Sequence, residues 1–311
     1  SSLSNYTINS TNSTIAAQSI HNNGVIADTL IYTVTGTLNG CAGIPLQTAI
    51  YVNPAPQIQF SNNDTFICSG APSPSVLISS ASPNVSFSWN AIVPSGISAA
   101  GLVLSGTNVI PSQTFNNNST GPLTVNYITQ VQTTVGATCP GAVDTFKITI
   151  NPNPVLSGII SSDTICYNTS CNIQLSSNIP GTIYTWTANP GLNMSGQASG
   201  VGALINQQLL NSSVNYDTVS YSVIPTFTMG GKTCPGFPFR YLITVAPSPI
   251  VSFAPSKQWI CSDDTTQAIT LSSTTPNCSF TWNAQNIPSG LSGVSSNGIS
   301  TIPAMHLINT T

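Results

Sequence analysis

The stretch Val85-Ser-Phe-Ser-Trp-Asn-Ala-Ile92 alternates apolar and polar residues, as does the shorter stretch around each of two later tryptophans. Alternation with period two is typical of a β-strand that has one face in a core. The tryptophans of these stretches are Trp89, Trp186 and Trp282, at intervals of 97 and 96 residues. A recurrence at this spacing predicts tandem copies of one all-β unit.

Other landmarks recur at the same spacing and extend the repeat over the whole chain. They are Cys68, Cys166 and Cys261; Cys41, Cys139 and Cys234; Tyr32, Tyr127 and Tyr221; and the linkers Asn53–Pro56, Asn151–Pro154 and Ala246–Pro249. A further motif, an apolar residue followed by another after five positions and by asparagine after two more, occurs four times.

We therefore expect tandem immunoglobulin-like β-sandwich repeats of about 95 residues, joined by proline-stiffened linkers into a rod. Two repeats are expected to be complete, and each end of the chain to hold part of one. The expected domains are 1–56, the C-terminal part of a repeat; 57–154 and 155–249, complete repeats; and 250–311, the N-terminal part of a repeat. The expected core anchors are Trp89, Trp186, Trp282, Tyr32, Tyr127 and Tyr221.

Composition excludes several classes of partner. Charged residues make up 4% of the chain, against roughly 25% in typical soluble domains. With four Lys and Arg residues and a net charge of −3, no basic patch can form for nucleic acid or for an anionic bilayer. No apolar run approaches the ~18–20 residues of a membrane span, so we expect no membrane insertion.

The chain also has few side chains that could act in catalysis or bind a metal ion. The chain has seven acidic residues, all aspartate, and two histidines, neither with an acid nearby at a repeat landmark. We therefore expect no enzyme and no catalytic residue. Asp263-Asp264 is the only adjacent acidic pair, and the Cys166-to-Cys171 interval has no match elsewhere, so we expect no metal site and no cofactor.

The eight cysteines suit an oxidising compartment and allow two periodic pairing schemes. Bridges across the linkers would each close 27 residues, as in Cys139 with Cys166. Bridges within repeats would join Cys68 to Cys139 and Cys166 to Cys234, over 71 and 68 residues. We favour the bridges within repeats, because a 27-residue route through a strand and a stiff joint should separate its ends. The linker scheme stays open.

Two cysteines have no counterpart in the sister repeats. Cys171 and Cys278 are in phase with neighbouring apolar residues, so we expect both to face cores as small apolar side chains. A local bridge between Cys166 and Cys171 is the alternative.

The ordered motifs Ile67-Cys-Ser-Gly, Ser86-Phe-Ser-Trp, Val-x-Tyr-x-Val, Cys-Pro-Gly and Ile-Thr-Val-x-Pro-x-Pro resemble the PKD-like repeats of giant surface proteins of Bacteroidota. The resemblance covers all 311 residues. It implies export by the type IX secretion route and a non-enzymatic structural place in an extracellular adhesin, stalk or surface filament. Its partners would be neighbouring repeats of the same chain or other copies. The alternatives are a carbohydrate- or surface-binding module, with surface glycans as partners, and a spacer attached to a secreted enzyme.

Six of the seven aspartates directly precede threonine. Turn chemistry at strand starts would account for part of this excess. The pattern also resembles the Asp-Ser/Thr-aliphatic signal for O-glycosylation of exported proteins in Bacteroidota. Full matches are Thr29, Thr164, Thr218 and Thr265, whereas Thr65 and Thr145 are each followed by phenylalanine.

Overall fold

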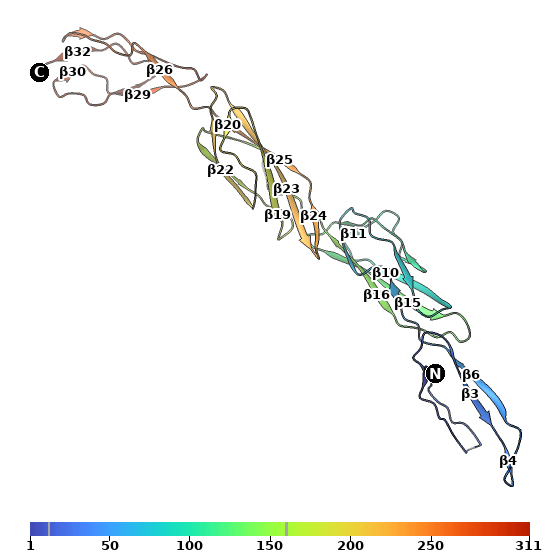
Figure 1. The fold of residues 1–311 in the computed structure, drawn as a ribbon. Coiled ribbons are helices and arrows are strands. Elements are labelled where there is room, and N and C mark those ends of the chain that lie inside the picture. The colour runs from blue at the N-terminus through green and yellow to red at the C-terminus, as the bar shows by residue number, and fades with distance from the viewer. Residues whose placement is uncertain (12, 159–160) are drawn as a thin grey trace. The chain divides into compact units, whose positions relative to one another are not determined.

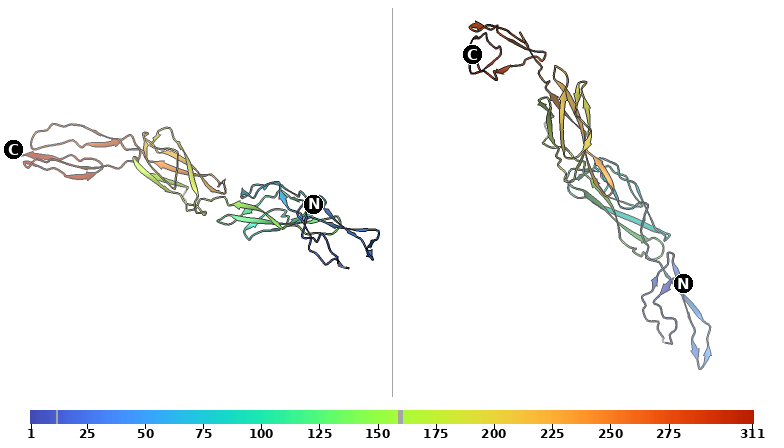
Figure 2. Two further views of the ribbon diagram at one scale, coloured as in Figure 1. Left: turned by 60° about the horizontal axis from the view of Figure 1, so that its bottom comes forward. Right: turned by 60° about the vertical axis from the view of Figure 1, so that its left-hand side comes forward.

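The computed structural model describes residues 1–11, 13–158 and 161–311, and within these ranges the chain forms strands and loops without a helix (Figures 1 and 2). It divides into two compact units. Unit 1 comprises Ser1–Pro154, Ile179–Thr182 and Thr226–Gly236, and unit 2 comprises Val155–Asn178, Ile183–Pro225 and Phe237–Thr311.

Residues 57–154 of unit 1 form a sandwich of two main sheets. The larger has the strand order β12-β10-β15-β16-β8, and the smaller has the order β13-β9-β7. β8 is parallel to β16, whereas β10, β15 and β16 pair antiparallel. The strands are β7 (Gln59–Phe60), β8 (Thr65–Cys68), β9 (Val76–Ser79), β10 (Val85–Ile92), β11 (Ile97–Ser98), β12 (Ser105–Gly106), β13 (Val109–Ile110), β14 (Asn116–Asn117), β15 (Leu123–Thr133) and β16 (Asp144–Asn151).

The core of this sandwich is built around an aromatic pair. Trp89 and Tyr127 are both buried and pack edge to face, with ring centroids 5.5 Å apart. The Trp89 indole donates a hydrogen bond of 3.0 Å to the Val109 carbonyl. Gly106 packs directly against the indole ring, and a Cβ at that position would come within 2.7 Å of the ring. Period-two alternation therefore places the large side chains between the sheets.

The other parts of unit 1 are a set of strands in residues 1–56 and two segments from later in the chain, the loop Ile179–Thr182 and the hairpin in Thr226–Gly236. In residues 1–56, β3 pairs with β6, β4 with β5 and β1 with β2. These strands are β1 (Leu3–Ser4), β2 (His21–Asn22), β3 (Asp28–Val34), β4 (Thr37–Leu38), β5 (Cys41–Ala42) and β6 (Leu46–Val52).

Unit 2 contains a second sandwich, whose larger sheet repeats the strand order of the first. Its larger sheet runs β17-β25-β23-β19-β21, with β24 paired to β23, and its smaller sheet runs β18-β22-β20. The strands are β17 (Ser162–Ile165), β18 (Thr169–Gln174), β19 (Ile183–Pro190), β20 (Met194–Ser195), β21 (Gly200–Val201), β22 (Leu204–Asn211), β23 (Asp217–Met229), β24 (Lys232–Pro235) and β25 (Phe239–Val245). The predicted fold class, tandem immunoglobulin-like sandwiches, is confirmed.

Residues 250–311 add pairs and a triplet of short strands to unit 2. β28 pairs with β26, β31 with β29, and β32 lies between β27 and β30. These strands are β26 (Val251–Ala254), β27 (Asp264–Thr265), β28 (Thr270–Ser273), β29 (Thr281–Asn283), β30 (Leu291–Ser292), β31 (Asn297–Ile299) and β32 (His306–Asn309).

The six expected core anchors differ in how well they are covered. Trp89, Tyr127, Trp186 and Tyr221 are buried in the two sandwiches, whereas Tyr32 and Trp282 are half-buried. The last two lie in residues 1–56 and 250–311, where fewer strands are present to cover an apolar face.

Candidate functional site

Unit 1 contains a disulfide bond between cysteines that come from two successive 95-residue repeats. It links Cys68, the last residue of β8, to Cys234 in β24, with the Cα atoms 5.4 Å apart and 166 residues between them in sequence. Strand β23 is long enough to make this possible, because it pairs with β25 over Asp217–Val223 and then continues to pair with β24. The tip of this second repeat, Thr226–Gly236, belongs to unit 1, and we call it the Cys234 hairpin.

Hydrogen bonds and close packing hold the Cys234 hairpin in place. Asn151 lies opposite Cys68 in the β16–β8 ladder and is fully buried. Its side-chain amide donates to the carbonyls of Met229 and Lys232, at 3.0 and 3.3 Å. Gly230, at the hairpin tip, has φ of 60°, and a Cβ there would lie 2.4 Å from the Phe66 ring. Only glycine fits this contact.

The same amide contact occurs once more in unit 1, one repeat earlier. The equivalent of the Cys234 hairpin is Val131–Gly141, which we call the Cys139 hairpin. The Asn53 amide donates to the carbonyls of Val135 and Ala137 at its tip, at 2.8 and 2.9 Å. Asn53 and Asn151 open the same linker motif, 98 residues apart, so the two contacts are repeat equivalents.

The disulfides predicted within repeats, Cys68 with Cys139 and Cys166 with Cys234, are wrong. In the first repeat, Cys68 pairs with Asn151 at the end of β16, and the neighbouring Ile150 pairs with Leu123 at the start of β15. Cys68 therefore lies near the Leu123 end of β15. The Cys139 carbonyl accepts a hydrogen bond from the amide of Thr133, at the other end of β15. Ten residues of strand separate these ends by ~33 Å, far beyond the ~7 Å that a disulfide allows.

The remaining cysteines are thiols, namely Cys41, Cys139, Cys166, Cys171, Cys261 and Cys278. Cys171 is buried, with its sulfur 3.9 Å from the Tyr221 hydroxyl. Cys278 is half-buried, with its sulfur 3.1 Å from the Thr275 carbonyl oxygen. The alternative bridge between Cys166 and Cys171 is also absent.

The Asp-Thr pairs share a local structure. In five of them, the aspartate carboxylate accepts a hydrogen bond from the amide of the following threonine, at 2.7–2.8 Å. In the sixth, the Asp64 carboxylate accepts instead from the Lys147 amide. Every pair lies at or next to the start of a strand. For Asp28, the amides of Ser2 and Thr29 lower the carboxyl pKa to about 2. Strand initiation therefore accounts for Asp-Thr pairs at several repeat positions.

The threonines of these pairs are accessible to different degrees. Thr29, Thr164 and Thr265 are exposed, and Thr65, Thr145 and Thr218 are half-buried. Thr164 and Thr218 flank Thr244 on one rung of three adjacent strands. Because that rung alternates with the buried residues of the same strands, both hydroxyls lie on the outer face of the sheet.

The titratable side chains of the described residues were expected to form no metal site. They contain no group of three or more His, Cys, Asp or Glu side chains that could hold a metal ion. His306 and Asp263 form an exposed contact of 3.3 Å. Burial raises the pKa of Tyr127 to about 12, and burial together with Cys171 raises that of Tyr221, which keeps both phenols neutral. In the same ranges, no helix is long and apolar enough to cross a membrane.

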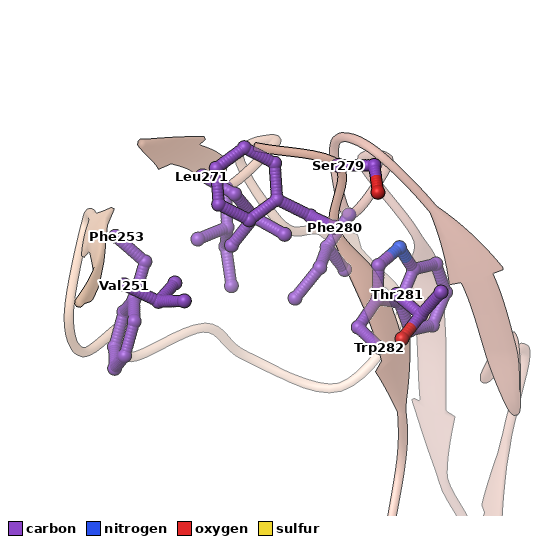
Figure 3. A pocket seen from close by; sticks show the side chains of 9 residues that line it. Val251, Phe253, Leu271, Ser279, Phe280, Thr281 and Trp282 are labelled. Carbon is purple, nitrogen blue, oxygen red and sulfur yellow. The ribbon is translucent and has the colours of Figure 1, made fainter. Parts of the chain in front are cut away.

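An apolar cavity of about 430 Å³ opens in residues 250–311. Figure 3 shows Val251 and Phe253 on one side of it and Trp282 on the other. In residues 57–154 the equivalent space is filled from β15 and β16, where Phe146 packs 5.4 Å from Phe60. The Trp282 indole nitrogen is buried without a hydrogen-bond partner. The cavity thus leaves apolar side chains of residues 250–311 uncovered.

Comparison with solved structures finds similar β-sandwich chains at low identity. Mouse cadherin-23 EC22-24 has a TM-score of 0.34 and 6% identity, covering 82% of this chain and 90% of that one. Protocadherin gamma B2 extracellular cadherin domains 3-6 has 0.29 and 10%, covering 92% and 76%. A protein of unknown function from Porphyromonas gingivalis W83 has 0.23 and 8%, covering 61% and 99%.

Comparison with curated protein sequences gives no match. The model of the PKD-like domain matches residues 1–56, 65–154 and 163–249, which together make up most of the chain. Its matches fall on the repeats whose cores and hairpins are described above. The chain therefore belongs to the PKD-like domain family.

Proposed function

We propose that the chain is a non-enzymatic, load-bearing repeat region of an extracellular adhesin, stalk or surface filament. The observation that carries this proposal is the Cys68–Cys234 bond, which joins successive repeats covalently. A hairpin that is both bonded and hydrogen-bonded through the buried Asn151 resists separation of repeats under tension. Such a joint serves a protein that transmits force between a cell and a distant contact.

Export to the cell surface is part of the proposal. A disulfide bond favours an oxidising compartment, and the resemblance to surface repeats of Bacteroidota favours the type IX route. The surface is nearly free of charge, so glycans on the Asp-Thr sites would supply hydration and shield strand edges. Thr29, Thr164 and Thr265 are the best placed acceptors, because their side chains are exposed.

The uncovered core in residues 250–311 calls for completion by further strands. We propose that these come from neighbouring repeats of the same polypeptide or from another copy. Limited proteolysis of residues 1–311 should cut first within 1–56 and 250–311, while 57–249 resists. A monomer that is protected at both ends would contradict this.

A replacement experiment separates a stalk from a binding module. In the natural protein, residues 57–249 would be deleted or replaced by two unrelated β-sandwich repeats of equal length, and cell adhesion measured. A stalk predicts that deletion weakens adhesion and that replacement restores it. If replacement fails to restore adhesion although the protein reaches the surface, the repeats themselves bind the ligand.

One observation favours the second candidate, a carbohydrate- or surface-binding module. Trp259 is 85% exposed, with the Lys257 ammonium 4.6 Å from its ring centroid. An exposed indole can stack on a sugar. Loss of glycan binding in Trp259→Ala, with binding retained in the exposed control Tyr51→Ala, would support this function.

A further inference from the structure

Four free thiols occupy the repeat positions of the two bonded cysteines, and two of them, Cys139 and Cys166, lie in the two sandwiches. Cys166 follows Ile165 at the end of β17, as Cys68 follows Ile67 in β8, and the interval between them is 98 residues. Cys139 and Cys234 both lie in Thr-Cys-Pro-Gly sequences on the returning arms of their hairpins, 95 residues apart. Each repeat thus carries one strand-end cysteine and one hairpin cysteine.

The Cys139 hairpin is already held in the way that the bonded hairpin is held. Asn53 binds its tip through two carbonyls, as Asn151 binds the tip of the Cys234 hairpin. The Cys139 thiol is free and half-buried, with its sulfur 3.6 Å from the Ala137 carbonyl oxygen. Cys234, beside its bonded partner, is fully buried. What Cys139 lacks is the strand-end cysteine, which the repeat spacing places outside residues 1–311.

Cys166 lines an open cavity at the place where Cys68 meets its hairpin. The cavity, of about 630 Å³, lies wholly in unit 2, and its wall includes Ala246 and Pro247, the equivalents of Asn151 and Pro152. Residues 275–279 form another part of the wall. The loop equivalent to them in the preceding repeat, Ile179–Thr182, belongs to unit 1 together with the Cys234 hairpin. Around Cys166 the loop is present and the hairpin is not.

We propose that the Cys68–Cys234 bond is one member of a periodic series, in which the strand-end cysteine of each repeat bonds to the hairpin cysteine of the next. Cys166 then forms a disulfide with the hairpin cysteine, in a Cys-Pro sequence, of another PKD-like repeat. Cys139 forms one with the strand-end cysteine of another repeat. This pairing follows from equivalence to an observed bond and holds whether or not the repeats serve as a stalk.

The chemistry of each new bond is a two-electron oxidation. The two thiols lose two protons and two electrons, and a sulfur–sulfur bond forms between them. The electrons pass through a mixed disulfide to a thiol–disulfide oxidoreductase, whose own disulfide is reduced to a dithiol. Cys166 is well placed for such exchange, because it is exposed.

Non-reducing peptide mapping of the exported, full-length polypeptide tests the series. Free thiols would be alkylated before digestion. We expect the Cys166 peptide to be linked to a Cys-Pro hairpin peptide, and the Cys139 peptide to a peptide with an Ile-Cys strand end. A Cys166 linked to Cys171 or Cys278, a Cys139 linked to Cys166, or alkylation of either thiol in the oxidised protein would overturn the proposal. The mass on a non-reducing gel then distinguishes bonds within one polypeptide from bonds between copies.

A substitution provides the matched control. Cys166→Ser should release one alkylatable thiol per chain, located on the partner hairpin. Cys171→Ser should release none, because Cys171 is a buried thiol without a covalent partner. No new thiol in Cys166→Ser would show that Cys166 was unbonded and would refute the series.

Discussion

Reduction of the Cys68–Cys234 bond is predicted to about double the length to which residues 1–311 can be pulled. When force is applied at the two ends, the bond carries the load past the 166-residue loop between the cysteines. At about 3.3–3.6 Å per extended residue, that loop withholds roughly 550–600 Å of extension. The rest of the chain supplies roughly 480–520 Å.

Single-molecule force spectroscopy measures this difference directly. Tethers at residues 1 and 311 would be pulled until every repeat has unfolded, with and without a reducing agent. Cys68→Ser with Cys234→Ser should give the long extension in both conditions, and Cys171→Ser should behave as the unmodified chain does. If the unmodified chain reaches full extension under oxidising conditions, the two repeats are not covalently joined and the load-bearing argument fails.

Three further outcomes follow from individual contacts. Asn151→Ala removes both hydrogen bonds from the buried amide to the Cys234 hairpin and should lower the free energy of unfolding of unit 1 by about 1–3 kcal/mol; denaturant titration should show a change within about 0.5 kcal/mol for the exposed control Asn118→Ala. Because burial raises the pKa of Tyr127 to about 12, the unfolded chain ionises first, so stability should fall between pH 10 and 12; a Tyr127→Phe variant whose stability falls as steeply would contradict this. The intact mass of the exported protein should exceed the mass of its polypeptide, with glycan on Thr29, Thr164 and Thr265 identified by peptide mapping; bare threonines at all four fully matching sites would reject glycosylation.

The period of the tryptophans and tyrosines was sufficient to predict the sandwich. In their strands, Trp89 and Trp186 each lie on the same face as other apolar residues. A strand with this alternation can bury only that face in a core. A glycine 14–17 residues after each tryptophan was an unused signal of the same kind. Gly106, Gly200 and Gly298 lie against the indole rings, where a Cβ would come within 2.5–2.7 Å.

The disulfide pairing could not be predicted in this way, because it depends on how far one hairpin extends. Both schemes drawn from spacing kept each cysteine in its own repeat or at the nearest linker. The structure pairs cysteines 166 residues apart, since β23 continues six residues beyond its pairing with β25, from Val223 to Met229. The recurrence of asparagine at the first two linkers was a signal of the contact, but its partners are backbone carbonyls, which leave no mark in a sequence.

The proposed series has a mechanical consequence that a single bond does not. Cys166 lies inside the loop that Cys68 and Cys234 close, so the next bond begins before the first has ended, and successive loops overlap. Tension entering at Cys68 passes to Cys234, runs through the 27 residues to Cys261, and leaves by the next bond. Of the 193 residues from Cys68 to Cys261, tension can then stretch only these 27 and the 27 from Cys139 to Cys166, which lie between two bonds of the series in the same way. The short linker interval, which no disulfide closes, is therefore the segment that bears the load. Its five prolines, Pro235, Pro238, Pro247, Pro249 and Pro255, restrict how far the backbone can still extend.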